Sequence, residues 1–303
     1  MSHSIYTNLI EQLIPNLPEH TGEPIELDLV LDNGAFNGLY LLGILLYLKV
    51  LESKGRIKVT RISGSSIGSV YAVLYFNDML DVTDKFFSEI REFWKNNCNL
   101  SNWKEHIQNV CKNIDLEKIN NKVYINYFDT SSCKEHILFS FNSIDELTET
   151  ISKSCFVPLL INGELTYKNC IDGFNPMLFN ERTIEDRKIL FVHLFTPERL
   201  YNCINVKNDK NITFRAIEGI YEVHKFFIGD KQTLCSYVNE WNTKQLLTYR
   251  IRQILYYLFI YLINVIVIAK KFIPHSFYDT PVWNLVSHIG SKIHRDFMLQ
   301  TCF

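Results

Sequence analysis

The chain has 303 residues and a formal net charge of −2 at pH 7. Hydrophobic residues make up 47 % and charged residues 21 %, a balance typical of a globular protein with a sizeable core. Because no surplus of Lys and Arg is present to neutralise phosphates, the composition argues against nucleic acid as a partner. Aromatic residues reach 14 %, which suits either a large core or an apolar ligand.

The cysteines are dispersed along the chain and form no CxxC or CxxxxC pair, so a zinc finger or ribbon is not expected. Residues 1–25 carry no basic-then-apolar signal sequence and are expected to be a leader with at most one short helix. We therefore expect reduced thiols in an intracellular, cytoplasmic protein that is not secreted.

Strands and helices alternate after the leader. Branched apolar runs predict strands at 25–32 and 57–64, and longer apolar runs predict helices at 39–55 and 66–80. This alternation predicts an α/β fold with a parallel sheet. In a right-handed crossover the turns after the two strands lie at one edge of the sheet, where ligands bind in open α/β folds.

The middle of the chain is mixed. Residues 84–120 are expected to be helical and amphipathic, and further strands are expected at 122–131, 136–142 and 188–195. Ser143 stands three residues before Glu146, a capping-box spacing that predicts the start of a helix. Asn162-Gly163, between apolar alternating runs, predicts a hairpin.

The most apolar stretch is residues 254–269, in which Asn264 is the single polar residue. It is slightly shorter than the roughly 20 apolar residues that span a bilayer. A buried core helix, an interfacial or membrane-anchoring helix and a true span are all open interpretations. Four flanking basic residues suit lipid headgroups as well as ordinary helix ends: Arg250, Arg252, Lys270 and Lys271.

The stretch RISGSSIGSV at 61–70 fits G-x-S-x-G in one frame, with Ser66 between Gly64 and Gly68. This pattern forms a tight strand-to-helix turn with a nucleophilic serine at its apex. Ser66 lies between an expected strand and an expected helix, and the helix N-terminus favours developing negative charge. The alternative is a Gly/Ser loop that caps a helix.

A serine nucleophile also needs an oxyanion hole and a base. The turn LDNGAFNG follows the first strand, and the backbone N–H groups of Gly34, Ala35 and Phe36 are candidates for the oxyanion hole. No histidine carries a local motif that marks it as the base. Asp172 ends an apolar strand in NCIDGF and is the candidate base, with an ordinary Asp-Gly turn as the alternative.

Together, these three features resemble the patatin-like phospholipases over roughly residues 26–195. The D-G-G-G-x-R/K-G segment of that family aligns with Asp32–Gly38, its nucleophile elbow with Ser66 and its catalytic aspartate with Asp172. SKSCFVPLL, with Pro158, is similar to the A-S-x-A-x-P-like stretch that precedes the family's aspartate.

The resemblance implies a three-layer α/β/α sandwich with a mainly parallel central sheet, plus a helical apolar C-terminal region. It implies a leader at 1–25, a catalytic domain at 26–235, and a C-terminal region at 236–303 that packs on the domain or on membrane. It also implies hydrolysis of fatty-acyl esters by a Ser66–Asp172 dyad, with Gly34 and Ala35 at the oxyanion. The substrate would be a membrane, lipid-droplet or micellar lipid, with no metal or other cofactor.

Four residues depart from the family pattern. Asn33 and Ala35 replace glycines, Asn37 replaces the basic residue, and Phe174 stands where Gly or Ala follows D-G. Two further functions are therefore considered. One is a catalytically weak or inactive family member that binds lipid or a protein partner, and the other is an acyltransferase that uses the same dyad.

Overall fold

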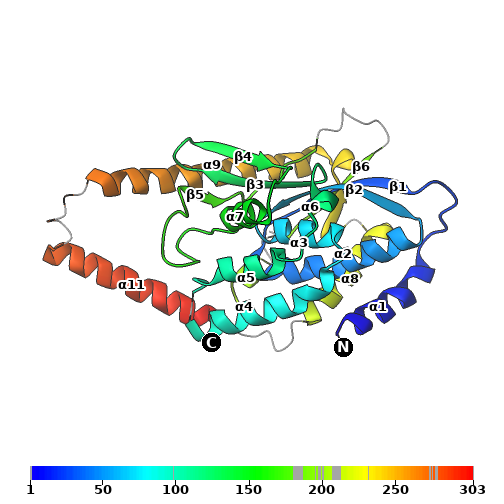
Figure 1. Cartoon of the computed structure of the whole chain (residues 1–303), viewed down its shortest axis with the longest axis horizontal. Helices are drawn as coiled ribbons and strands as arrows, with labels where there is room; N and C mark the ends of the chain where they lie inside the picture. The colour runs from blue at the N-terminus through cyan, green and yellow to red at the C-terminus, as the bar shows by residue number, and fades with distance from the viewer. Residues whose placement is uncertain are drawn as a thin grey trace.

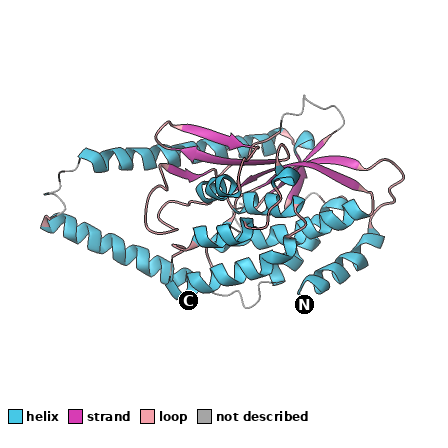
Figure 2. Ribbon diagram, in the orientation of Figure 1, coloured by secondary structure: helices cyan, strands magenta, loops and turns pink. Residues whose placement is uncertain are grey.

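The computed structural model describes residues 2–97, 99–179, 187–194, 196, 199, 201–206, 213–230, 232–272, 274, 276 and 279–302. These residues form a mixed seven-stranded sheet with helices on both faces, a three-layer α/β/α arrangement (Figures 1 and 2). The strands are β1 Ile25–Leu31, β2 Ile57–Ser65, β3 Val123–Asp129, β4 Lys134–Leu138, β5 Cys170–Asp172, β6 Lys188–Val192 and β7 Cys235–Tyr237. The helices of four residues or more are α1 Ser2–Leu13, α2 Gly38–Ser53, α3 Ile67–Phe76, α4 Thr83–Asn97, α5 Trp103–Cys111, α6 Leu116–Ile119, α7 Ile144–Ser154, α8 Thr213–Phe227, α9 Thr243–Phe272 and α11 Pro281–Cys302.

The centre of the sheet is parallel and its margins are antiparallel. The order is β4-β3-β2-β1-β6-β7, with β5 paired to β3. Strands β3, β2, β1 and β6 run parallel, whereas β4, β5 and β7 are antiparallel to their neighbours. The predicted adjacency of the first two strands is confirmed, and their carboxyl ends share one edge. The domain boundary expected after residue 235 falls within β7, so residues on both sides of it belong to the sheet.

One face of the sheet carries the main hydrophobic core. Helices α2, α3 and α8 pack there, and Tyr6 and Ile10 of α1 belong to the same core. The helical segment Ala35–Ser53, which includes α2, is long and apolar enough to cross a membrane, but 78 % of its apolar window is buried inside the fold. Its apolar composition is therefore explained by burial on all sides.

The opposite face is covered by the first half of α9. Tyr249 packs there against Val30 and Phe191 of the sheet. Tyr256 and Ile260 continue the packing, against Phe128 and Ile171 of the sheet. Farther along, α9 extends past the sheet, and α11 follows it (Figure 1). Only 17 % of the apolar window of α9 is buried. The interpretation of residues 254–269 as a buried core helix is therefore wrong. One side of this helix packs on the sheet, and its other side is exposed.

The local sequence patterns predicted the other secondary-structure elements correctly, with one exception. The Ser143 hydroxyl accepts from the N–H of Glu146, which confirms the predicted helix start. The hairpin at Asn162-Gly163 is wrong: these residues form a turn without flanking strands, because the apolar residues before it line a pocket. The two-residue turn that leads into β5 is Lys168-Asn169, where both residues have positive φ.

The two glycines of the serine motif allow β2, α3 and the end of β1 to approach one another closely. A Cβ on Gly64 would lie 2.4 Å from the carbonyl oxygen of Gly68. A Cβ on Gly68 would lie 2.6 Å from the carbonyl oxygen of Leu31 and 2.9 Å from that of Asp32. Only a residue without a side chain fits either position.

Replacement of Gly68 by alanine is expected to destabilise the fold by about 1–3 kcal/mol, since the added methyl overlaps backbone that has no room to move. Urea unfolding followed by circular dichroism measures this loss. Gly22→Ala is the matched control, because nothing lies within 4 Å of a Cβ at that position. Equal stability of the two variants would contradict the close approach of β1 and α3.

Candidate active site

Strand β3 brings the two candidate catalytic residues together. Its first half pairs with β2, where Ser65 lies opposite Asn126. Its second half pairs with β5, where Asp172 lies opposite Tyr127, the next residue along. Strand β2 runs toward this point from one direction and β5 from the other. Their carboxyl ends therefore abut, and the residue after β2, Ser66, meets the last residue of β5.

Ser66 occupies a strained turn between β2 and α3. Its φ is 53° and its ψ is −126°, a conformation that residues with side chains rarely adopt. The Ser66 N–H donates to the hydroxyl oxygen of Ser154 at 3.0 Å, which helps to hold this backbone. Ser66 is only 5 % exposed. The turn has the geometry expected of a nucleophile elbow. The neighbouring Ser63 lies in β2 and Ser69 in α3.

Asp172 is a buried carboxyl within reach of the serines. It is 1 % exposed, and its Oδ1 accepts from the N–H of Phe174 at 2.8 Å and from the hydroxyl of Ser65 at 3.4 Å. Burial raises the pKa of Asp172 from its usual 3.8 to about 7, and the hydroxyl of Ser66, the N–H of Phe174 and the hydroxyl of Ser65 oppose this rise. The nearby charge of Asp32 also raises this pKa. A carboxyl of this kind can accept a proton at neutral pH.

The candidate oxyanion turn, residues 32–38, lies beside the elbow. Ala35 has a φ of 45° and begins a short helical turn, Ala35–Asn37, that leads into α2. The first N–H groups of a helical segment have no acceptor inside it and remain free for a ligand. Gly34, Ala35, Ser66 and Asp172 line one pocket, so the candidate oxyanion donors face the same space as the candidate dyad. Phe36 lines a second pocket together with Ser66.

Two neighbouring residues hold the backbone around the candidate dyad, and the sequence did not indicate a role for either. Ser154, at the end of α7, holds the N–H of Ser66, and two residues later the carbonyl of Phe156 accepts from the N–H of Asp172 at 2.8 Å. The side-chain amide of Asn126 donates to the carbonyl oxygens of Gly173 and Asn175. Ser154 lies in the SKSCFVPLL stretch, whose similarity to the family pattern could have indicated a role for it. Asn126 could not be found without the strand register.

The departures from the family pattern are engaged in contacts. Asn37 donates to the carbonyl oxygen of Arg199 at 2.9 Å and accepts from Arg215 of α8 at 3.2 Å, so a cation from elsewhere in the chain lies beside the neutral Asn37. Phe174 has a φ of 47° and packs its ring against Tyr256 of α9. Asn33 accepts from Arg252 of α9 at 3.0 Å. Arg252 therefore faces the candidate site, whereas the sequence indicated only that it precedes the apolar run 254–269.

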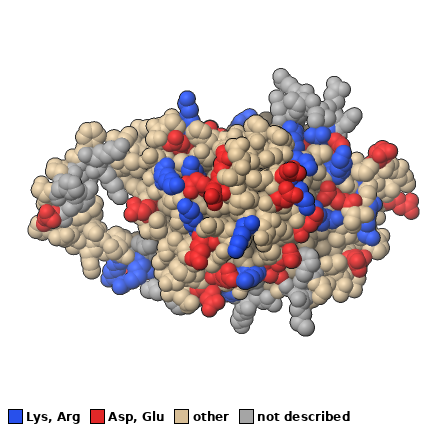
Figure 3. Space-filling model, in the orientation of Figure 1, with Lys and Arg blue, Asp and Glu red and all other residues tan. Residues whose placement is uncertain are grey.

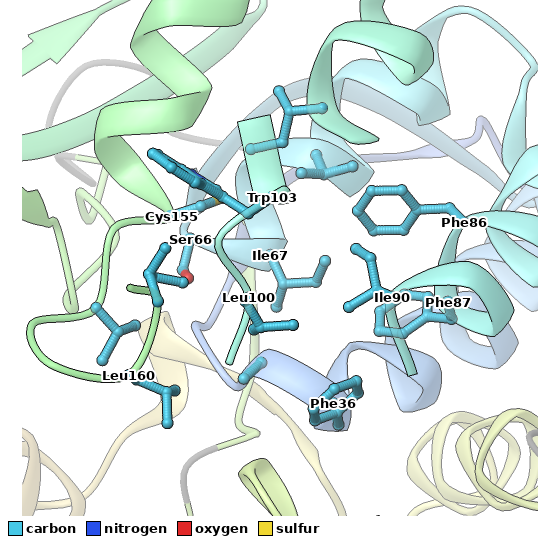
Figure 4. A pocket seen from close by; sticks show the side chains of 15 residues that line it. Phe36, Ser66, Ile67, Phe86, Phe87, Ile90, Leu100, Trp103, Cys155 and Leu160 are labelled. Carbon is cyan, nitrogen blue, oxygen red and sulfur yellow. The ribbon is translucent and has the colours of Figure 1, made fainter. Parts of the chain in front are cut away.

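Two pockets meet at Ser66. The first is apolar and extends from Ser66 toward helices α4 and α5, with Trp103 and Cys155 near the serine and Phe86, Phe87 and Ile90 farther away (Figure 4). The second contains the oxyanion turn and Asp172. Val157 and Leu160 line both. A bond placed at Ser66 could therefore have an apolar chain on one side and the polar turns on the other.

The histidines that the structure describes lie elsewhere. His193 follows β6, and its Nε2 is hydrogen-bonded to the hydroxyl of Ser236 at 2.7 Å. Burial lowers the pKa of His193 to about 4. Both pockets at Ser66 lack a histidine among their described lining residues. Within the same part of the chain, no group of three His, Cys, Asp or Glu side chains could hold a metal ion.

Comparison with known protein families identifies the family to which the chain belongs. A family model described as patatin-like phospholipase matches residues 29–194, which is more than half of the chain. The protein therefore belongs to the patatin-like phospholipase family, and this membership indicates a hydrolase of lipids. The matched region runs from within β1 to just beyond β6 and includes both Ser66 and Asp172. No curated protein sequence matches the chain.

The Asp172→Asn variant is expected to gain stability relative to the wild type as the pH rises from about 4 to about 7. In this window the folded protein keeps a proton on Asp172 that the unfolded chain releases near pH 3.8. The wild type therefore loses this stabilisation as the pH rises through the raised pKa, whereas the amide does not titrate. Urea unfolding of both proteins at pH 4 and pH 8 tests this, and a pH-independent difference would contradict the buried, unpaired carboxyl.

Proposed function

We propose that this protein is a phospholipase A-type lipid acyl hydrolase in which Ser66 is the nucleophile and Asp172 the general base. One observation carries the proposal: Ser66 on its strained elbow lines the same pocket as Asp172, a buried carboxyl whose pKa is raised to about 7. A serine hydroxyl is a weak nucleophile until a neighbouring base removes its proton. Asp172 can supply that base without a histidine.

The acylation step follows from these positions. As the Ser66 oxygen attacks the acyl carbon, its proton passes to the Asp172 carboxylate, and the carbonyl oxygen becomes an oxyanion. The N–H groups of Gly34, Ala35 and Phe36 are the proposed donors to that oxyanion. The tetrahedral intermediate then collapses, and the leaving alcohol takes the proton from Asp172. An acyl ester on Ser66 remains.

Deacylation uses the same groups in the same order. A water molecule gives a proton to Asp172 as its oxygen attacks the acyl carbon of the ester. The second tetrahedral intermediate forms at the same turn and collapses, and the proton on Asp172 returns to the Ser66 oxygen as the fatty acid leaves. The apolar pocket beside Ser66 supports a long acyl chain as the group transferred, because its walls offer dispersion contacts and few hydrogen-bonding groups.

A fluorophosphonate probe is expected to label the wild type at Ser66, and Ser66→Ala is expected to abolish labelling. Asp172→Asn should slow labelling by ~10³-fold or more, because the amide cannot accept the serine proton. Gel fluorescence after denaturation measures the rate. Ser63→Ala, on the same strand, is the control that should label normally.

Two results would contradict the proposed enzyme. The first is an unlabelled wild type in both detergent and vesicles, which would favour an inactive lipid-binding protein. The second is undiminished labelling of Ser66→Ala, which would move the nucleophile to another residue.

We further propose that α9 docks on the surface of a lipid bilayer. Residues 253–269 contain no charged side chain, and the outward side of the helix is apolar, with Leu255 61 % and Tyr261 69 % exposed. Figure 3 shows few charged side chains over the part of the molecule at the left of the view, where α9 and α11 project. A helix that is apolar on both sides is normally buried in protein or in lipid.

The other side of α9 supports an interfacial position in preference to a span. Residues at helical spacing face the domain along Tyr249–Ile263 and fix this part of the helix to the fold. A spanning helix needs lipid or protein in the bilayer around about 20 residues, which the packed domain does not allow here. A helix in the plane of the interface, with its inner side on the domain and its outer side in lipid, satisfies both sides.

Helix α11 offers a second apolar stripe of the same kind. Its exposed apolar residues recur every three or four positions, at Val282, Leu285, Val286, Ile289 and Ile293. A lipid surface is the proposed occupant because the family acts on lipids, which the enzyme must meet in a bilayer, droplet or micelle. Free thiols at Cys111, Cys133, Cys155, Cys170, Cys203 and Cys235 support an intracellular site of action, on a cytoplasmic leaflet.

Leu255→Glu combined with Leu258→Glu is expected to reduce flotation with phosphatidylcholine vesicles by at least tenfold, because two carboxylates would enter the interface. Hydrolysis of a soluble short-chain ester should remain unchanged, since neither side chain lines the pockets at Ser66. Ile228→Glu, at an exposed apolar position after α8, is the matched control and should float normally. Equal flotation of wild type and double variant would refute docking through α9.

A further inference from the structure

Asp32 at the end of β1 is the buried centre of a charged cluster. Its side chain is fully buried, and its carboxylate accepts from the N–H of Asn33 at 3.0 Å and from the N–H of Leu194 at 3.2 Å. The guanidinium of Arg252 binds the same carboxylate with two nitrogens, one of them at 2.7 Å from Oδ2. A bidentate pair of this type fixes the orientation of both side chains.

The same guanidinium reaches two further groups. Its Nη2 donates to the side-chain oxygen of Asn33 at 3.0 Å and to the carbonyl oxygen of Phe174 at 3.0 Å. Asn33 begins the oxyanion turn, and Phe174 lies two residues after Asp172. One side chain of α9 therefore connects the turn proposed to hold the oxyanion with the turn that carries the proposed base.

We propose that Arg252 is a positioning residue that sets the oxyanion turn and the Asp172 turn at the separation that catalysis requires. The inference rests on the proposed function, and it assigns a catalytic task to a helix outside the region matched by the family model. Arg252 does not line the two pockets at Ser66, so it acts through Asn33 and Phe174 and not on the substrate.

Backbone strain on both sides of Arg252 gives the reason why a clamp is needed. Ala35 and Phe174 both have positive φ, a backbone conformation that is unfavourable for residues other than glycine. Such conformations persist only where surrounding contacts hold them. The fork of Arg252 supplies contacts to both turns at once, and the hydroxyl of Tyr256, one helical turn later, adds a hydrogen bond to the carbonyl oxygen of Asp172 at 2.9 Å.

The residues that differ from the family pattern agree with this assignment. Asn33 and Phe174 are two of the four departures, and α9 contacts both of them. A glycine at position 33 would offer Arg252 no side-chain oxygen. A glycine or alanine at position 174 would offer Tyr256 no ring to pack against.

Arg252 also controls the charge that Asp172 experiences. The titratable and charged groups that face Asp172 are Asp32 from β1, Cys155 from the end of α7 and Tyr256 from α9. Asp32 raises the pKa of Asp172, and the cation of Arg252 lies against that same carboxylate. Loss of the cation would expose Asp172 to the full negative charge of Asp32.

The test is steady-state hydrolysis of a soluble p-nitrophenyl ester across pH 5–9 by full-length wild type, Arg252→Ala, Arg252→Lys and Arg250→Ala. For Arg252→Ala we expect kcat to fall ~10–100-fold with KM nearly unchanged, because the turns are displaced while the apolar pocket is intact. The acidic limb of the pH profile should move to higher pH. Arg252→Lys should give an intermediate kcat and keep the wild-type limb, since it retains the charge but not the fork.

Arg250→Ala is the matched control, because Arg250 is exposed and its guanidinium donates a hydrogen bond to the side chain of Gln253 in the same helix. Unchanged kcat in Arg252→Ala, or a loss of kcat without a shift of the acidic limb, would overturn the inference. If Arg252→Ala does not fold, wild-type kcat in Arg252→Lys would overturn it equally. A wild type that releases no product would instead refute the proposed function, and the inference would fall with it.

Discussion

The proposed site depends on one constraint, which is that β3 serves as the common partner of two strands that end head to head. Asn126 pairs with Ser65 of β2, and Tyr127 pairs with Asp172 of β5. Because adjacent residues of one strand fix both ends, Ser66 and Asp172 meet although they lie far apart in the sequence. The glycines of the elbow allow β1 and α3 to approach this point closely, and the proposed oxyanion turn after β1 then lies beside it. The register of one strand thus locates the proposed nucleophile, base and oxyanion donors.

Two buried aspartates at this edge of the sheet differ in their partners. Asp32 is paired with the guanidinium of Arg252, whereas Asp172 is surrounded by hydroxyl groups and one backbone N–H. Removal from water raises the pKa of Asp172 to about 7, which is the basicity that its proposed role as the base for Ser66 requires. A buried carboxyl of this kind reduces stability at neutral pH, so the same feature that supports the proposed catalysis weakens the fold.

The parts of this account that could be predicted from the sequence are those encoded locally. The alternation of apolar runs predicted the sheet, the G-x-S-x-G frame selected Ser66, and a strand followed by Asp-Gly selected Asp172. Ser154, Asn126 and Arg252 could not be assigned, because their roles come from strand register and from a helix that returns to the site. The apolar run of α9 was ambiguous for a related reason: hydrophobicity does not distinguish the side of a helix that faces a sheet from the side proposed to face lipid. The hairpin at Asn162-Gly163 was predicted wrongly because apolar residues that line a pocket mimic a strand.

Helix α9 links the proposed membrane surface to the proposed chemistry, since its outer side is apolar while its inner side holds the turns at Asn33 and Phe174. The central claim remains the covalent role of Ser66, and trapping of the acyl-enzyme tests it most directly. The protein would be incubated with a long-chain p-nitrophenyl ester, quenched in acid and digested for peptide mass spectrometry. We predict the mass of one acyl group on the peptide that contains Ser66, lost in Ser66→Ala. An acyl group on a different residue, or release of fatty acid with no acylated peptide at any time, would contradict the account.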